Sequence, residues 1–207
     1  MNKNYVLYGR QGGGSLIIQF LLEELGATYR IEWVDKDAAS DPSSPYRKIC
    51  PTGKIPALVL PDGTSMFESA AICIHLTDTH PEAKLAPPRG SSDHAHFLQW
   101  MLFLATGVYG SVLRFYYAPR YTAQNDGNGV KETALAEFEE HLSLIESQLS
   151  GFLAGSALTA ADFYLYMLAG WHPDGYEAVQ KKFPKVGALC ETVGARATVK
   201  RVMDQNN

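Results

Sequence analysis

The chain of 207 residues is long enough for one large domain or two small ones, and a hydrophobic content of 46% allows a sizeable core. Its formal net charge of −4 excludes the basic excess that is typical of proteins binding nucleic acid or an anionic membrane, so neither partner is expected. The three scattered cysteines have no CxxC spacing, which argues against a disulfide framework or a metal site and favours a reducing, cytoplasmic compartment.

The first part of the chain predicts a strand, a glycine-rich turn and a helix. Residues 5–8 form an apolar run that Arg10 ends, which is too short for a signal peptide and is typical of a buried strand. After the turn, apolar residues recur at helical spacing between Ser15, the expected N-cap, and Gly26, the expected residue after the C-cap. Alternation predicts a second strand at 29–34, and a strand–helix–strand order predicts a parallel pair.

The next elements follow from turn residues and apolar runs. We expect, in order, a polar loop at 35–45, a short helix at 46–49, strands at 57–60 and 65–67, and a helix at 68–79. Asp62-Gly63 marks a hairpin between the two strands because such a pair tolerates the positive φ of tight turns. Residues 1–81 therefore predict an α/β domain of order βαβαββα with a mixed four-stranded sheet.

The second half differs in composition. Prolines, glycine and serines between 82 and 92 indicate a linker, and residues 93–207 contain no convincing strand, so we expect an all-α domain. No apolar stretch approaches the ~18 residues that suggest a membrane span. The expected helices lie at 95–115 (with a bend near Gly107 and Gly110), 131–149, 160–171, 176–183 and 186–203.

Lys54-Ile55-Pro56 opens the third strand. Proline at that point costs no ladder hydrogen bond. If the Ile55–Pro56 bond is cis, the N–H and C=O of Ile55 face outward and can pair with an extended ligand as an added strand would. The alternative is an ordinary strand-entry proline, since only ~5–6% of such bonds are cis.

Glu68-Ser69 follows the fourth strand and opens a helix. The backbone N–H groups and the Ser69 hydroxyl there form an anion site for a ligand carboxylate, and Glu68 can balance an α-ammonium group. The alternative is simple helix capping, in which the carboxylate interacts with the helix dipole.

The turn Gly12-Gly13-Gly14 lets a ligand approach the backbone closely. Ser15 would place its hydroxyl and a helix N-terminus beside a bound thiol, and both favour the thiolate. The alternatives are a flexible capping turn or a phosphate-binding loop, but neither GxGxxG nor GxxxxGK[ST] is present.

In chain order, these features resemble the cytosolic glutathione transferases of bacterial type, over essentially the whole chain. Ile55-Pro56-Ala57-Leu58 matches the cis-proline motif of that family, and Glu68-Ser69 matches its pair for the γ-glutamyl group. Thr159-Ala160-Ala161-Asp162 matches its buried capping box, a folding element in which Thr159 and Asp162 bond reciprocally to the helix start. The resemblance implies a thioredoxin-like glutathione-binding domain at 1–81, glutathione as co-substrate, no metal, a detoxifying role and a cytoplasmic homodimer.

The resemblance also implies residue roles. Gly14 aligns with the beta-class catalytic cysteine, so that thiol is lacking, and the candidates for activating the bound thiol are Ser15, then Tyr8, then Arg10, with help from a backbone N–H of the turn. The expected glutathione-binding residues are Lys54, which would meet the glycyl carboxylate, and Ile55, Pro56, Glu68, Ser69 and Gly14. The small hydrophobic electrophile would lie between the domains against Tyr109, Tyr116, Tyr117 and Trp171, with Phe115, Arg114 and Arg120 nearby, unless these aromatics are core residues.

The resulting hypothesis is a glutathione transferase that favours the thiolate and adds sulfur to an electrophile. The first alternative is a related ligand-binding or protein-interaction module without turnover, which the glycine turn without cysteine favours. The second is a specialised glutathione-dependent isomerase, lyase or peroxidase.

Overall fold

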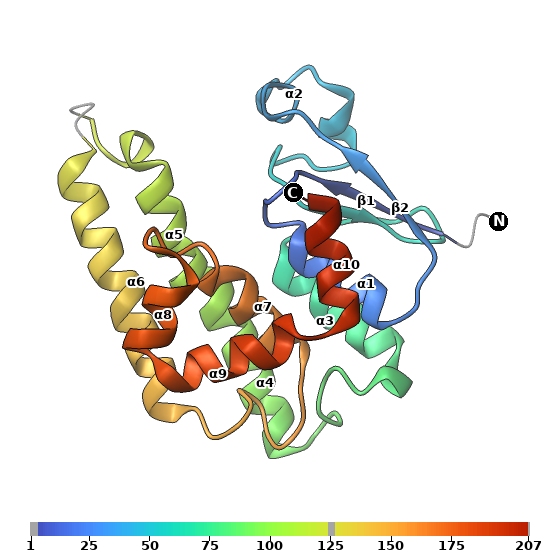
Figure 1. The fold of residues 1–207 in the computed structure, drawn as a ribbon. Coiled ribbons are helices and arrows are strands. Elements are labelled where there is room, and N and C mark those ends of the chain that lie inside the picture. Colours follow the sequence, from blue (N-terminus) through green and yellow to red (C-terminus); the bar gives the residue numbers. More distant parts are fainter. Residues whose placement is uncertain (1–3, 124–126, 207) are drawn as a thin grey trace. The chain divides into compact units, whose positions relative to one another are not determined.

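A computed structural model describes residues 4–123 and 127–206, which form two units, each with its own internal packing (Figure 1). The first unit contains residues 4–86 together with 195–206, and the second contains residues 87–194. The predicted combination of an α/β part and a helical part is confirmed.

The first unit is built on a mixed sheet in the order β2-β1-β3-β4. The strands are β1 (Tyr5–Gly9), β2 (Tyr29–Trp33), β3 (Ala57–Val59) and β4 (Ser65–Phe67). β1 runs parallel to β2 and β3 pairs antiparallel with β4, as predicted, and β1 also pairs antiparallel with β3. The hairpin between β3 and β4 turns at Gly63, whose φ is +94°, and Asp62 accepts a hydrogen bond from the Thr64 N–H at 2.8 Å.

Helix α1 (Leu16–Glu24) carries the apolar face that buries this sheet, and it packs against α3 (Ser69–Thr79). It ends as predicted: Gly26 has φ +60°, the Gly26 N–H bonds to Glu23, and the Ala27 N–H bonds to Leu22. The predicted loop at 35–45 contains an unexpected helix, α2 (Lys36–Ser40), because Asp35 accepts hydrogen bonds from the N–H groups of Asp37 and Ala38. Two 3₁₀ turns complete the unit, η1 (Pro45–Lys48) near the expected short helix and η2 (Pro81–Ala83).

The last expected helix, at 186–203, is divided into two. α9 (Pro184–Gly194) belongs to the second unit, whereas α10 (Ala197–Asn206) belongs to the first and packs on α1 (Figure 1). Val199 and Val202 are its fully buried side chains. The expected all-α domain at 93–207 included this segment.

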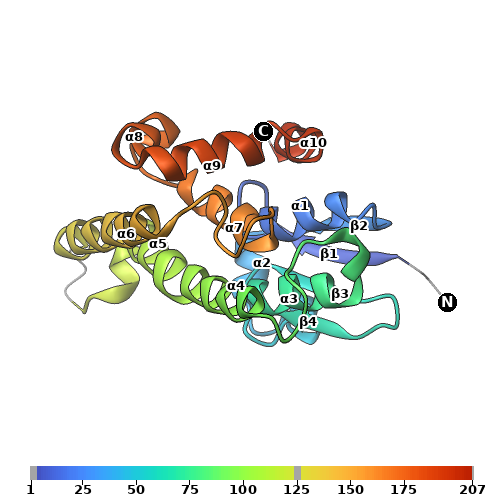
Figure 2. The same ribbon diagram turned by 90° about the horizontal axis from the view of Figure 1, so that it is seen from below.

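The second unit is helical. Its remaining elements are α4 (Ser92–Phe103), η3 (Leu104–Val108), α5 (Tyr109–Tyr116), η4 (Ala118–Tyr121), α6 (Asn128–Gln148), α7 (Ala160–Ala169) and α8 (Gly175–Lys182). η3 is a π-helical turn located where a bend was predicted, and α6 runs alongside α5 (Figure 2). α7 is buried along almost its whole length. Within the described residues, the stretch Ser92–Tyr116 is long and apolar enough to cross a bilayer, a criterion that core helices of soluble proteins also meet.

Candidate functional site

The turn between β1 and α1 is closed by Ser15. Its side chain is only 2% exposed, and its hydroxyl accepts a hydrogen bond from the Arg10 N–H and donates one to the Arg10 carbonyl, both at 3.0 Å. Ser15 occupies the N-cap position of α1, as predicted, but its side chain caps no helix N–H and its backbone is already helical at φ −72°, ψ −17°. A hydroxyl has one proton. In this structure the Ser15 hydroxyl donates that proton in its hydrogen bond to the Arg10 carbonyl.

Glycines make this closure possible. A Cβ at position 9 would lie 2.9 Å from the Ser15 hydroxyl oxygen, so a larger residue there would displace that side chain. Gly12 has φ +62°, and the Gly13 N–H bonds to the Arg10 carbonyl at 3.0 Å. Gly14 is buried, and the side chain of Arg10 is exposed, so Arg10 carries a solvent-facing positive charge on the turn.

Tyr8, the second-last residue of β1, packs against a small cluster of residues that includes part of the loop before β3. Its ring centroid is 5.7 Å from that of Tyr46, and the cluster also contains Cys50, Ala57 and Ile55. Burial, followed by the nearby Cys50 and Tyr8, raises the pKa of Tyr46 well above its usual range. The Tyr46 hydroxyl donates to the Lys54 carbonyl at 2.6 Å. Tyr8 and Tyr46 therefore pack against the Lys54-Ile55 segment, which is expected to bind the ligand at the start of β3.

The Ile55–Pro56 peptide bond is cis. Within the described part of the chain, neither the N–H nor the C=O of Ile55 forms a hydrogen bond with the protein. Lys54 is exposed and Pro56 is buried. The backbone of Ile55 is therefore available to pair with an extended ligand.

Arg47, which the sequence did not single out, holds this loop from behind. Its guanidinium donates to the carbonyls of Pro51 at 2.9 Å and Ser40 at 3.1 Å. A longer contact, of 3.4 Å, reaches the Asp41 carbonyl. Gly53, at φ +66°, passes so close that a Cβ would lie 2.3 Å from the Ala39 carbonyl oxygen and 2.4 Å from the Arg47 Cζ. Loop glycines and arginines are common, so no local pattern identified this pair.

Glu68 precedes α3 with an unusual backbone, φ +70° and ψ +104°, outside the conformations that non-glycine residues normally adopt. Such strain is concentrated at functional sites. Glu68 occupies the N-cap position of α3, and its exposed side chain makes no capping hydrogen bond to the helix. Ser69, the next residue, is 8% exposed.

The sheet brings these three segments together. Tyr8 pairs with Ala57, and Ala57 pairs with Phe67, so the three residues form one row across β1, β3 and β4. The glycine turn follows Tyr8, Pro56 precedes Ala57, and Glu68 follows Phe67. The two predicted peptide-binding segments and the turn therefore meet at one end of the sheet.

The predicted electrophile-binding aromatics lie in the second unit. The ring centroid of Tyr109 lies 5.3 Å from that of Trp171, with the two rings tilted by 54°. The Tyr116 hydroxyl donates to the Trp171 carbonyl at 2.9 Å. The guanidinium of Arg120 lies over the ring of Tyr117, with the Arg120 Cζ 4.4 Å from the ring centroid. Burial raises the pKa of Tyr116 although half of the residue is exposed. Tyr109, Tyr116 and Trp171 thus form one cluster.

The predicted capping box at the start of α7 is confirmed. The fully buried Asp162 accepts hydrogen bonds from the Thr159 N–H at 2.7 Å, the Thr159 hydroxyl at 2.9 Å and the Leu153 N–H at 2.8 Å. Burial raises the pKa of Asp162 despite these bonds, which act to lower it. The group holds a loop to a helix and faces no site.

Cysteine and metal chemistry do not mark any other site in the described chain. Cys50, Cys73 and Cys190 are buried free thiols, and burial raises the pKa of Cys190 to about 12. Among residues 4–123 and 127–206, no three His, Cys, Asp or Glu side chains are arranged to hold a metal ion.

Comparisons with known proteins agree with this arrangement. The family models "Glutathione S-transferase, N-terminal domain" and "Glutathione S-transferase, C-terminal domain" match residues 15–79 and 111–197. Glutathione S-transferase GstA of Escherichia coli O157:H7 is 27% identical over 168 residues, which cover 80% of this chain and 81% of that protein. Elongation factor 1-gamma 1 of Oryza sativa subsp. japonica is 31% identical over 182 residues, covering 79% of this chain but only 40% of that protein. A solved sphingomonad glutathione S-transferase complexed with glutathione is 26% identical, has a TM-score of 0.82, and the match covers 97% of this chain and 98% of that chain.

Proposed function

The chain belongs to the cytosolic glutathione S-transferase superfamily, and we propose that it is an active glutathione transferase, which binds glutathione, favours its thiolate and joins the sulfur to a small electrophile. The observation that carries the proposal is the row Tyr8–Ala57–Phe67, which gathers the glycine turn, the cis-proline segment and Glu68 at one end of the sheet. A tripeptide needs anchors for its backbone and both ends, and these segments supply them.

The peptide part of glutathione is held by two segments in this proposal. The backbone N–H and C=O of Ile55 pair with the cysteinyl residue of glutathione, and the exposed Lys54 meets the glycyl carboxylate. At the other end, Ser69 and the start of α3 receive the γ-glutamyl carboxylate, and Glu68 balances its ammonium group. Arg47 and Tyr46 support the first segment from behind.

The sulfur lies against the glycine turn in this proposal. Ser15 would have to give up its bond to the Arg10 carbonyl in order to donate to a thiolate, so we assign it to closing the turn. The remaining stabilisers are backbone N–H groups of the turn and the positive charge of Arg10, with Tyr8 as the side-chain alternative. Lowering the thiol pKa by about two units requires ~2.7 kcal/mol of differential stabilisation, which such groups can supply.

The electrophile is proposed to bind an apolar aromatic surface, and Tyr109, Tyr116 and Trp171 are the candidates because they already form a cluster. Tyr117 is retained as a candidate with the charge of Arg120 above it. A homodimer in the cytoplasm is proposed from the family alone, and light scattering tests the oligomeric state.

Calorimetric titration with glutathione tests the proposal. We expect the wild type to bind at millimolar glutathione or below and Glu68→Gln to bind roughly tenfold more weakly, the loss of one charged contact of ~1.4 kcal/mol. Glu82→Gln, which removes an exposed carboxylate outside the site, is the matched control and should bind like the wild type. Absence of binding by the wild type would refute the proposal.

The second candidate is a glutathione-transferase-like binding module without turnover. Three observations favour it: glycine at position 14, the hydrogen bond that already uses the Ser15 hydroxyl proton, and the similarity to Elongation factor 1-gamma 1 of Oryza sativa subsp. japonica. Conjugation assays with several classes of electrophile distinguish the two, because binding of glutathione without conjugation supports only this second candidate.

A further inference from the structure

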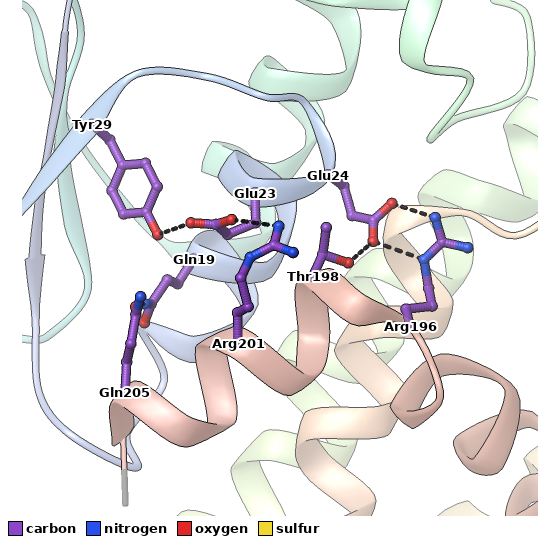
Figure 3. A network of polar contacts seen from close by, with 8 residues as sticks. All are labelled: Gln19, Glu23, Glu24, Tyr29, Arg196, Thr198, Arg201 and Gln205. Carbon is purple, nitrogen blue, oxygen red and sulfur yellow. Dashed lines mark hydrogen bonds and ion pairs between the residues drawn. The ribbon is translucent and has the colours of Figure 1, made fainter.

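Helix α10 is joined to α1 by a polar network with two parts (Figure 3). The first part is ionic. The Glu24 carboxylate accepts hydrogen bonds from Arg196 Nε at 2.7 Å and Arg196 Nη2 at 2.5 Å, and also from the Thr198 hydroxyl. Arg201 reaches Glu23 at 3.1 Å. The Glu24 side chain is only 6% exposed, so this end anchors α10 firmly at its first turn.

The second part consists of amides. Gln19 of α1 is 1% exposed, and its Nε2 donates to Gln205 Oε1 at 2.7 Å (Figure 3). Its Oε1 accepts a hydrogen bond from Asn206 Nδ2 at 2.9 Å. Both halves of a buried side-chain amide are therefore satisfied by the last turn of α10. Leaving either half unpaired would carry the desolvation cost of a buried polar group without a partner.

Asn206 also reaches the glycine turn. Its Oδ1 accepts the Gly12 N–H at 3.4 Å, across 194 positions of sequence, while its Nδ2 also donates to the Val202 carbonyl at 2.8 Å. The side-chain amides of Gln205, Gln19 and Asn206 thus form a chain of hydrogen bonds that ends at the Gly12 N–H, in the exposed middle of the turn. Gln19 itself lies one helical turn after Ser15, because its N–H bonds to the Ser15 carbonyl at 3.0 Å.

The turn has few other restraints. Glycine is the most conformationally free residue, and a run of glycines has no side chains with which to fix itself. The Ser15 hydroxyl bonds to the backbone of Arg10 and so joins the two residues that flank the turn. Neither of these hydrogen bonds involves Gly12, whose φ is +62°. The contact from Asn206 is the side-chain hydrogen bond that the described residues make to the N–H of Gly12.

We propose that Asn206 is a positioning residue: through Gln19 and the Gly12 N–H, it holds the glycine turn in the shape that receives the sulfur of glutathione. The proposal rests on the proposed function for what the turn receives, but its structural half, the restraint on Gly12, can be tested without ligand. It makes the last helix of the chain a part of the site formed by the first strand and helix.

The test uses full-length Asn206→Ala, with Asp204→Ala as the matched control, an exposed side chain on the same helix. Amide hydrogen exchange is measured in the free protein, and the ionisation of the bound glutathione thiol is measured by its thiolate absorbance. In Asn206→Ala we expect exchange at residues 11–14 to accelerate by about tenfold or more, as local opening becomes easier, with α1 protected as in the wild type. The bound thiol should ionise at higher pH than in the wild type, and Asp204→Ala should change neither quantity.

Three outcomes overturn the inference. Unchanged exchange at residues 11–14 in Asn206→Ala removes the restraint. Faster exchange along the whole of α10 and α1, with a lower melting temperature, assigns Asn206 to helix docking alone. Faster exchange of the turn with an unchanged thiol ionisation removes its link to the reaction. If the wild type does not bind glutathione, the proposed function fails, and the exchange data alone decide the restraint on Gly12.

Discussion

The Ser15 hydroxyl forms a two-way bridge with the backbone of Arg10, accepting from its N–H and donating to its C=O, both at 3.0 Å. A serine before an apolar helix usually serves as a cap, and in a thiol-binding turn it is a natural donor to sulfur. Here its proton and one lone pair are used to close the turn. The groups left to act on a thiol are therefore Arg10, Tyr8 and the N–H groups of the turn other than those of Gly12 and Gly13, which already have partners.

Replacement of Ser15 by alanine should destabilise the protein. The change leaves the N–H of Arg10 without its partner in a part-buried turn and removes one of the two hydrogen bonds to the Arg10 C=O, which keeps the bond from the Gly13 N–H. The expected cost is ~1–3 kcal/mol in the free energy of unfolding. Urea denaturation measures this loss, and conjugation rates should be normalised to the folded fraction. An unchanged free energy of unfolding together with a raised thiol pKa would instead return Ser15 to direct contact with sulfur.

Gly53→Ala should weaken both the fold and glutathione binding. The new Cβ would meet the Ala39 carbonyl oxygen at 2.3 Å and Arg47 Cζ at 2.4 Å, in addition to the strain of φ +66°. We expect a loss of ~1–3 kcal/mol in the free energy of unfolding and a weaker affinity for glutathione, since the loop carrying Lys54 must shift.

The matched control for that change is Gly63→Ala. Gly63 also has positive φ, +94°, but a Cβ there meets nothing within 4 Å. It should cost stability through backbone strain alone and leave the affinity for glutathione unchanged. Equal losses of affinity in the two variants would contradict a supporting role for the contact between Gly53 and Arg47.

Glu68→Gly should separate stability from binding. Glycine adopts φ +70° without the strain that glutamate bears, so the free energy of unfolding should rise by about 1 kcal/mol. Affinity for glutathione should nevertheless fall, because the carboxylate is lost. Lys84→Gly is the control: Lys84 also has positive φ, +54°, but lies outside the site, so its replacement should leave the affinity unchanged. A Glu68→Gly variant that binds like the wild type would remove Glu68 from the site.

Some of these features followed from local rules, and others did not. Turns and helix caps depend on residue types within a few positions of one another, so the sequence predicted four of them. These are Gly26, the Asp62-Gly63 hairpin, the proline at the start of β3 and the Thr159–Asp162 box. The sequence predicted that Glu68 and Ser69 begin a helix, but it did not predict the positive φ of Glu68, because glutamate rarely adopts such a conformation.

The failures have two physical causes: a local pattern with two possible outcomes at Ser15, and dependence on partners distant in the sequence at the last helix. A serine that caps and one that bonds back to Arg10 have the same sequence pattern. The break before α10 was missed because ordinary helix-forming residues occupy it, and the contacts that place Arg196 come from Glu24, 172 positions away. The partners of Gln19 and Gly12 likewise lie on that last helix, beyond the reach of any local motif.

The contact between α1 and α10 should weaken in acid. Burial acts to raise the pKa of Glu24, but hydrogen bonds from Arg196 and Thr198 and the charges of Arg196 and Arg201 outweigh it, so the pKa is lowered. A lowered pKa gives stability that is present above the unfolded-state value, ~4.3, and is lost as pH falls below it. Glu24→Gln should therefore be less stable than the wild type by about 1–3 kcal/mol at neutral pH, with the difference shrinking below about pH 4.

Urea denaturation of the two proteins across that pH range measures this difference. Glu82→Gln, at an exposed carboxylate, should follow the wild type throughout. A difference between Glu24→Gln and the wild type that stays constant down to the lowest pH would contradict the assignment of the ion pair.

The most direct test of the central claim is the pH titration of the thiolate absorbance of glutathione bound to the wild-type protein. If the turn, Arg10 and the start of α1 favour the thiolate, the bound thiol should ionise about two pH units below the ordinary thiol value of ~8.5. A bound thiol that titrates like free glutathione would contradict thiol activation and leave only the binding module.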